Sequence, residues 1–160
     1  HVPQLGYHIC ERQRGLLPQV LTPILSRRFC FKARAKNTRY DHDTYTELQK
    51  AWKWVLVVCF GYTGYRNARY GRIECHESIT AFSRDILLTA VEVAQQEGYE
   101  VLHGIVDSLW VKGAAGCSPP SRLSRRISIR TGIRMAVEGR YKWIVYLRSK
   151  GTGGGAWTQY

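Results

Sequence analysis

The sequence predicts an α+β protein in which helices come first, followed by a short antiparallel sheet, a helix and further strands. Three long segments repeat apolar residues at the spacing of an α-helix, and two apolar runs flank a single aspartate, Asp107. Strands and helices do not alternate regularly, which argues against a doubly wound parallel sheet. The length of 160 residues suits one domain, or one domain with a projecting subdomain.

A helical hairpin is expected after an irregular lead-in over residues 1–15. The first helix is predicted over 16–36, where apolar residues recur every three or four positions. Asp41 to Thr44 provide an N-cap for a second helix, and Glu47, three residues after Thr44, completes a capping-box pattern. This helix should end near Phe60, and the short polar loop between the helices predicts an antiparallel pair.

The remaining elements are shorter and are separated by residues typical of turns. The third helix has a natural C-cap in Gly98, and Asp107 is predicted to occupy the tight turn of a hairpin. The expected segments are a loop at 61–71, a helix at 77–96, strands at 99–106 and 108–111, a loop at 113–121, a helix at 123–131, and a second hairpin from 135–138 and 142–147.

The chain is strongly basic, with 24 Lys and Arg against 12 Asp and Glu, a net charge of +12 and a pI near 9.8. Arginine predominates, and its planar guanidinium donates paired hydrogen bonds to phosphate. The balance predicts a polyanionic partner, while the alternative is a soluble basic protein without one. The segment from Ser121 to Lys150 contains a single acidic residue, Glu138. Its cationic residues are Arg122, Arg125, Arg126, Arg130, Arg134, Arg140, Lys142, Arg148 and Lys150.

Aromatic residues are interleaved with this basic segment, a combination that suits a groove tracking a nucleic acid strand. Trp143 and Tyr146 lie on the predicted second hairpin, so we expect these two to pack beneath a sheet instead.

The five cysteines are scattered and form no CxxC pair, which argues against a zinc ribbon or knuckle. Reduced, mostly structural thiols in a cytosolic compartment are expected. The sequence contains neither a signal peptide nor an apolar run long enough to span a bilayer, so no membrane partner is predicted. Because the sequence begins at His1 without a methionine, we expect a piece of a longer protein.

A cationic stripe is predicted on the first helix, where Arg28, Lys32 and Lys36 are spaced by four residues and Arg34 extends the set. On the second helix, Lys53 shares a face with Phe60. If the helices are antiparallel, Arg28, Lys32 and Lys53 converge on one anion, and three cations suit a triphosphate. The alternative is a solvated charged face.

Asp107 lies in the segment His103-Gly104-Ile105-Val106-Asp107-Ser108, between two apolar runs. A carboxylate at such a turn is well placed to bind Mg²⁺. The alternative is an aspartate that only favours the turn.

Taken together, these segments resemble the family-B DNA polymerases, most closely a sequence-divergent minor archaeal group. Arg28 to Lys36 resemble the first fingers helix of the family, and Lys53 to Gly64 resemble the second. Three further segments resemble parts of the palm. Ile79-Thr80-x-x-Ser83-Arg84 resembles a palm helix, and His103 to Ser108 resemble the palm hairpin Tyr-x-Asp-Thr-Asp-Ser. Val137 to Trp143 resemble a later palm segment.

The chain departs from the family pattern at several positions. Ile105 replaces the first aspartate of the palm hairpin, so Asp107 alone remains of that pair. Val57 and Val58 replace an Asn-Ser pair, Phe60 replaces a tyrosine, and Ser83 replaces a glycine. No segment matches the Asp-x-x-Ser-Leu-Tyr-Pro type that carries the other catalytic carboxylate of the family, and the nuclease and thumb segments have no counterpart here.

The resemblance implies a polymerase palm, an antiparallel sheet with packed helices, over residues 61–160, and a two-helix fingers hairpin over 16–60. It implies Mg²⁺ as cofactor, with two ions in a complete site, and as partners a DNA primer-template, dNTP and the remainder of a polymerase (upstream palm, nuclease and thumb regions). The implied site residues are Asp107 for catalysis and metal, Arg28, Lys32, Lys53 and Phe60 for nucleotide, and Arg84, Arg140, Tyr141, Lys142 and Lys150 for DNA.

Three functions follow as hypotheses. The first is a fragment of an active DNA-directed DNA polymerase, itself inactive because carboxylates are missing, and located in the cytoplasm with the nucleoid. The second is an inactivated polymerase module that binds DNA or organises a replication or repair complex, which Ile105 and Val57 favour. The third is a basic RNA- or ribosome-associated protein, which is supported only by the net positive charge.

Overall fold

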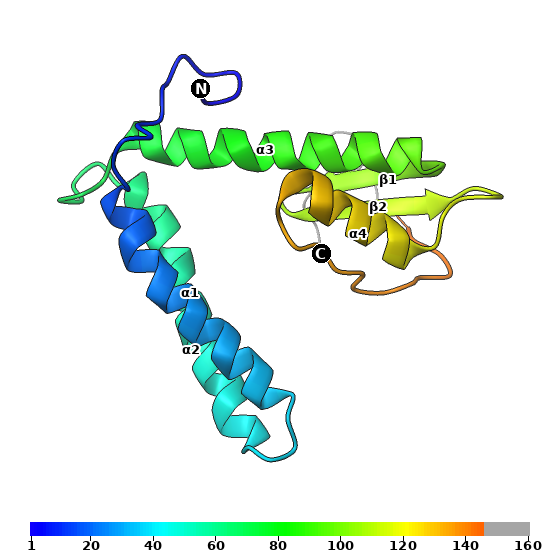
Figure 1. Cartoon of the computed structure of the whole chain (residues 1–160), viewed down its shortest axis with the longest axis horizontal. Helices are drawn as coiled ribbons and strands as arrows, with labels where there is room; N and C mark the ends of the chain where they lie inside the picture. Colours follow the sequence, from blue (N-terminus) through cyan, green and yellow to red (C-terminus); the bar gives the residue numbers. More distant parts are fainter. Residues whose placement is uncertain (146–160) are drawn as a thin grey trace.

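The longest helix, α3 (Ile73–Gln96), connects the two halves of the molecule in a computed structural model that describes residues 1–145. Helices α1 and α2 project together from the N-terminal end of α3, whereas two strands and α4 lie against its C-terminal half (Figure 1). This arrangement leaves the hairpin and the sheet on the same side of α3. The predicted α+β class is confirmed.

Helices α1 (Leu16–Ala35) and α2 (His42–Thr63) form the expected antiparallel hairpin. Phe31 of α1 packs between Tyr45 and Trp52 of α2, with ring centroids 6.0 and 6.3 Å away. None of the residues of α1 is buried, and Thr63 is the buried residue of α2. Aromatic contacts along one seam therefore hold the pair together.

The start of α2 differs in detail from the sequence prediction. Asp41 is the N-cap, and its carboxylate accepts hydrogen bonds from the backbone nitrogen of Asp43 and, at 2.5 Å, from the hydroxyl of Thr44. The Thr44 bond lowers the pKa of the Asp41 carboxyl. The expected capping box between Thr44 and Glu47 is therefore wrong, because Thr44 is engaged by Asp41 and Glu47 instead pairs with Lys50 at 2.7 Å.

Helix α3 begins at Ile73, four residues before its predicted start at Glu77, and α2 continues past Phe60 to Thr63. The loop between them is consequently shorter than the expected 61–71. The predicted C-terminus is confirmed, since Gly98 follows the helix with φ of 82°, a left-handed conformation that glycine adopts without strain.

Strands β1 (Tyr99–Ile105) and β2 (Ser108–Gly113) form a two-stranded antiparallel sheet. Ile105 pairs with Ser108, so Asp107 occupies the turn as predicted. Val106, predicted as the end of the first strand, also lies in the turn and has φ of 52°. An irregularity between Val101 and His103 shifts the register. The sheet lies along α3, and Gly104 of β1 is close to Leu87 of α3, since a Cβ on Gly104 would lie 3.6 Å from that side chain.

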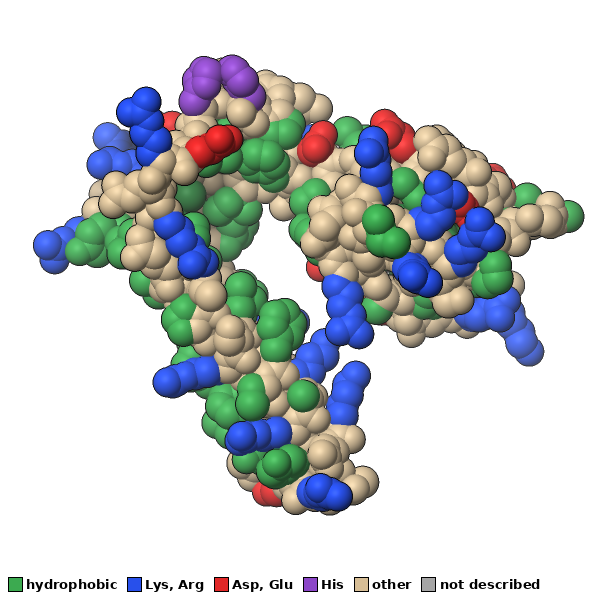
Figure 2. Space-filling view, viewed as in Figure 1, with side chains coloured by type: hydrophobic (Ala, Val, Ile, Leu, Met, Phe, Trp, Pro, Cys, Tyr) green, Lys and Arg blue, Asp and Glu red, His purple; other side chains and the backbone are tan. Residues whose placement is uncertain are grey.

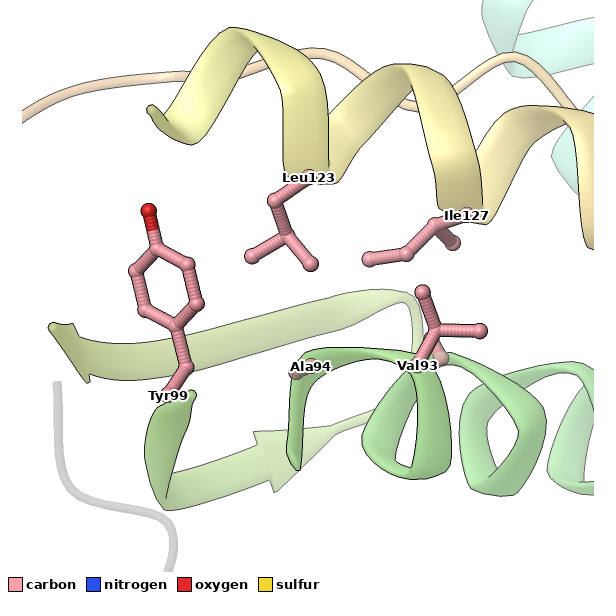
Figure 3. Close-up of a cluster of buried hydrophobic side chains, with 6 residues drawn as sticks. Val93, Ala94, Tyr99, Leu123 and Ile127 are labelled. Atoms are coloured by element: carbon pink, nitrogen blue, oxygen red, sulfur yellow. The ribbon is translucent and has the colours of Figure 1, made fainter. Parts of the chain in front are cut away.

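Helix α4 (Pro120–Thr131) completes the core by covering the sheet and the end of α3. It begins with Pro120 at its first position, three residues before the predicted start at Leu123, where proline costs no helical hydrogen bond. Side chains from three elements meet there (Figure 3). The buried core consists of Ala90, Val93, Ala94, Tyr99, Leu123 and Ile127.

A buried carboxylate also joins α3 to α4. The side chain of Glu97, at the C-cap of α3, is only 6% exposed and accepts a hydrogen bond from Arg126. Arg122 lies 3.7 Å from the same carboxylate. The two guanidinium groups neutralise Glu97 and thereby fix α4 along the end of α3.

The lead-in segment is irregular, as predicted, but it is docked on α3. Val2 is 2% exposed, and the hydroxyl of Tyr7 donates to the Glu77 carboxylate at 2.6 Å. This hydrogen bond raises the pKa of Tyr7. Arg84 donates to Gln4 at 2.9 Å, so two side-chain hydrogen bonds hold the segment along α3.

The predicted second hairpin is wrong as far as the structure describes it. Residues 135–138 and 142–145 form no strand, and the rest of the second predicted strand, with Tyr146, lies outside the described residues. Trp143 is 77% exposed, so the expectation that it packs beneath a sheet is also wrong. Strands need a pairing partner, and those residues have none within 1–145.

Two further observations bear on the class of protein. No helix within residues 1–145 is long and apolar enough to cross a membrane. All five cysteines are unpaired thiols, with Cys10 and Cys30 exposed and the others half-buried.

The core predicts unequal effects of truncating two isoleucines of α4. Ile127 is 5% exposed, so Ile127→Ala should lower the free energy of unfolding by about 2–4 kcal/mol through lost burial and a residual cavity. Ile129 on the same helix is 73% exposed, so Ile129→Ala should change it by less than about 0.5 kcal/mol. Urea titration of both variants is the measurement, and equal losses would contradict the described core.

Candidate functional site

The contacts between α1 and α2 determine the level at which each cation lies on the hairpin. The Arg27 guanidinium lies 5.6 Å from the ring centroid of Trp52, so these residues face each other. Arg28 and Lys53 follow them by one position. Since the helices are antiparallel, Arg28 and Lys53 lie at about the same level of the hairpin. Arg28 is half-buried in line with Ile24 and Phe31 at the seam, whereas Lys53 is exposed.

Lys32 lies one turn further toward the tip, with its side chain rotated away from the seam. Lys32 and Lys53 are exposed, and none of the three cations forms an ion pair within residues 1–145. The Nε atom of Arg28 is buried and has no hydrogen-bond partner there. We call Arg28, Lys32 and Lys53 the cationic flank.

Arg34 does not extend this set, contrary to the sequence prediction. Its guanidinium lies 5.4 Å from the ring of Tyr40 and 5.5 Å from that of Tyr45, and it donates to the Tyr45 hydroxyl at 3.3 Å. That hydrogen bond raises the pKa of Arg34. Arg34 therefore closes the tip of the hairpin and is committed to aromatic rings of its own chain.

Phe60 lies at the joint between α2 and α3. Its ring is stacked on His76, with centroids 4.3 Å apart and planes inclined by 22°. The buried hydroxyl of Thr63 donates to the Phe60 carbonyl at 2.6 Å and lies 3.3 Å from Nδ1 of His76. Phe60 is still 41% exposed, so one part of the ring supports the joint and another part remains open.

Asp107 is exposed at the turn of the sheet, and the Ser108 hydroxyl donates to its Oδ1 at 3.4 Å. The packing of Gly104 near Leu87 sets this turn beside the middle of α3. Among residues 1–145, no three His, Cys, Asp or Glu side chains are grouped closely enough to hold a metal ion. Asp107 thus offers one carboxylate at this turn, and Ile105, two residues before it, is aliphatic.

The hairpin, α3 and the β1–β2–α4 unit surround an open notch in the space-filling view (Figure 2). Lys and Arg side chains project toward its open side from both the hairpin and the unit opposite. The molecule thus has a concave face with cations at its margins, a shape that admits an extended polyanion.

The residues implicated in DNA contact are spread over several elements. Arg84 is exposed on α3 and bonded to Gln4, whereas Arg140 and Lys142 are exposed beyond α4. Tyr141 is 69% exposed and packs on Trp110 of β2, with ring centroids 5.1 Å apart. Lys150 lies outside the described residues.

Sequence reasoning missed two features of this region. The first is the pairing of Glu97 with Arg126 and Arg122, which joins α3 to α4. The apolar periodicity of each helix gives no indication of this contact. The second is the stack of His76 on Phe60, for which the sequence offers no signal because it depends on how α2 meets α3.

Comparison with known proteins identifies the chain's relatives. Residues 4–113, from the lead-in to the end of β2, match the family described as DNA polymerase family B. DNA polymerase 2 of Saccharolobus solfataricus is 35% identical over 140 residues, covering 88% of this chain and 20% of that protein. DNA polymerase 2 of Aeropyrum pernix is 30% identical over 151 residues, covering 92% and 19%. The chain thus spans about a fifth of the length of these relatives.

The joint predicts opposite effects for the same substitution at Gly61, within α2, and at Gly64, its C-cap. A Cβ on Gly64 would lie 3.0 Å from Nδ1 of His76, whereas a Cβ on Gly61 would meet nothing within 4 Å. Gly61→Ala should stabilise the chain by about 0.5–1 kcal/mol because alanine favours the helix. Gly64→Ala should destabilise it by about 1–2 kcal/mol because the histidine ring must move.

Chemical denaturation monitored by circular dichroism measures both glycine variants. Gly64 has φ of −89°, which any residue adopts, so backbone strain does not contribute to the difference. Stabilisation by Gly64→Ala equal to that by Gly61→Ala would contradict the described joint.

Proposed function

Because the chain belongs to DNA polymerase family B, we propose that it is the part of a DNA-directed DNA polymerase that binds the incoming dNTP and the primer-template. The projecting hairpin serves as the fingers, and α3 with the sheet and α4 serves as part of the palm. The complete reaction is that of the parent protein, which the chain represents only in part.

The observation that carries this proposal is that Arg28 and Lys53 lie at about the same level of the hairpin. Two cations at one level, without acidic partners within residues 1–145, suit the phosphates of a nucleoside triphosphate. Lys32 adds a third charge one turn away. Phosphoryl transfer depends mainly on positioning and on stabilisation of charge, which such a cluster supplies.

The primer-template is the proposed partner of the exposed cations on the palm side. Arg140 and Lys142 flank Tyr141, whose ring is anchored on Trp110 and still exposed, an arrangement that combines phosphate contact with a surface for stacking. Arg84 adds a charge on α3, although its bond to Gln4 must be shared or broken for such a contact.

The described residues do not fit a complete Mg²⁺ site. Two-metal catalysis requires carboxylates that bridge both ions, and Asp107 contributes one. We therefore assign Asp107 as a single ligand and derive no catalytic step from it. A second carboxylate must come from another part of the parent protein if that protein is active.

The alternative function is a polymerase module that has lost catalysis and binds DNA within a replication or repair complex. It is favoured by Ile105, which places an aliphatic side chain where the family has an aspartate, and by Val57 and Val58 in place of Asn-Ser. The two functions share the DNA surface and differ in whether a complete parent extends a primer.

The cationic flank predicts that nucleotide binding depends on Lys53. Lys53→Ala should weaken Mg²⁺-dNTP binding about tenfold, the effect of losing a charge-assisted contact of about 1.4 kcal/mol. Lys50→Ala is the matched control, since Lys50 is on the same helix but paired with Glu47 at 2.7 Å. Titration with a fluorescent dNTP measures both, and equal losses would indicate that general charge, not the flank, binds the nucleotide.

Because Asp107 is a single carboxylate and two metal ions need at least two, we predict that the isolated chain does not extend a primer with either Mg²⁺ or Mn²⁺. A labelled primer-template incubated with the chain and all four dNTPs is the assay. Activity that disappears in Asp107→Ala would show that the chain holds a second carboxylate ligand, with Glu138 the first to test. Extension that returns when the upstream palm segment of the parent is added would identify the chain as half of a split active site.

A further inference from the structure

The outer face of α4 carries a stripe of arginines that the proposed dNTP site does not use. Arg122, Arg126 and Arg130 are spaced by four residues, and Arg125 lies beside them, so they follow one side of the helix. Leu123 and Ile127 are buried in the core, whereas the four arginines are exposed. The arginines therefore lie on the exposed part of α4, with Arg122 and Arg126 along the margin next to Glu97 of α3, and cationic side chains gather over α4 in Figure 2.

This arrangement works against the helix that carries it. Like charges four residues apart repel each other, by about 0.2–0.5 kcal/mol per pair, and the stripe contains two such pairs. The first turn of α4 contains no acidic residue, and its N-cap, Pro119, offers no side-chain hydrogen bond. Arg122 lies near the positive end of the helix dipole, where cations are unfavourable. A helix whose charges oppose its own stability in this way often carries those charges for a function.

Glu97 compensates for only part of this charge. It accepts from Arg126 and lies near Arg122, while Arg125 and Arg130 have no ion pair with any residue from 1 to 145. The stripe continues into exposed residues of the following segment: Arg134, Arg140 and Lys142. The sole acid between 120 and 145 is Glu138, so the surface is cationic beyond the length of the helix.

We propose that the outer face of α4 is a second contact for the phosphate backbone of DNA, separate from the cationic flank. The proposal rests on the assignment of DNA as partner. From Arg122 to Arg130 the helix rises about 12 Å, which corresponds to three or four phosphates along one strand. Arginine suits this partner because its fork pairs with phosphate oxygens.

The position of α4 separates this contact from the hairpin. Helix α4 packs on the C-terminal half of α3, whereas α2 meets its N-terminal end (Figure 1). Helix α3 is about 36 Å long at 1.5 Å per residue, so both surfaces reach one duplex only at separate points. A duplex held at α4 is thereby oriented relative to the notch.

The experiment compares two double variants of the chain that remove the same charge from opposite ends of α3. Arg125→Ala with Arg130→Ala removes the two arginines that Glu97 does not hold. Arg66→Ala with Arg69→Ala, in the loop between α2 and α3, is the control. Affinity for a short fluorescein-labelled duplex is measured by anisotropy over a series of salt concentrations, together with the melting temperature of each protein.

We expect the slope of log affinity against log salt to fall by about 1.8 in the α4 variant, since each lost phosphate contact removes about 0.9, and by less than half as much in the control. Arg125→Lys with Arg130→Lys should retain most of the slope, because the charge is kept. The melting temperature of the alanine variant should be unchanged or higher, because repulsion on α4 is relieved.

The outcomes distinguish this proposal from the proposed function. An unchanged slope in the α4 variant, or equal losses in both double variants, would overturn the α4 contact while leaving DNA binding intact. Failure of the unaltered chain to bind the duplex in a salt-dependent way would instead overturn DNA as partner, and the α4 contact with it. A melting temperature lowered by the alanines would show that the arginines serve stability and would overturn the proposal too.

Discussion

The attachment of α2 to α3 is the constraint on which the relation between hairpin and sheet depends. Helix α1 makes no direct packing contact with α3, so among the helices it is α2 that joins the hairpin to α3, while the lead-in segment before α1 is bonded to α3 through Tyr7 and Gln4. At that junction the stacked rings of Phe60 and His76 lie beside the buried hydroxyl of Thr63. The distance between the cationic flank and Asp107 is therefore governed by a few side chains, and small changes in them are amplified along the 22 residues of α2.

Local patterns predicted most of the elements because their physical causes are local. The helices of the hairpin follow from apolar periodicity, and the turn at Asp107 follows from the interruption of two apolar runs. The sequence offers an N-cap for α2 within Asp41 to Thr44, where Asp41 and Thr44 both suit that role, and the spacing of Thr44 and Glu47 suggests a capping box that does not form. The choice between neighbouring caps depends on backbone geometry that composition does not encode.

Tertiary contacts account for what the sequence did not predict. Residues 135–138 have a strand-like composition, yet a strand forms only where a partner pairs with it, and pairing is decided by distant segments. Arg34 was grouped with the cations of its helix because spacing reveals the face but not the neighbour, and Tyr40 and Tyr45 bind it instead. The register that aligns Arg28 with Lys53 likewise needs the contact between Arg27 and Trp52.

The turn beside Asp107 stores conformational energy. Val106 has φ of 52°, a region that a β-branched residue enters at a cost of about 1–3 kcal/mol, and its side chain is 78% exposed, so it recovers little by burial. The cost is offset by the packing of Leu109 and Val111 against the core that α3 and α4 share. The carboxylate at the tip is thus held in place by hydrophobic burial some distance away, and loosening that core would release the tip before it unfolded the helices.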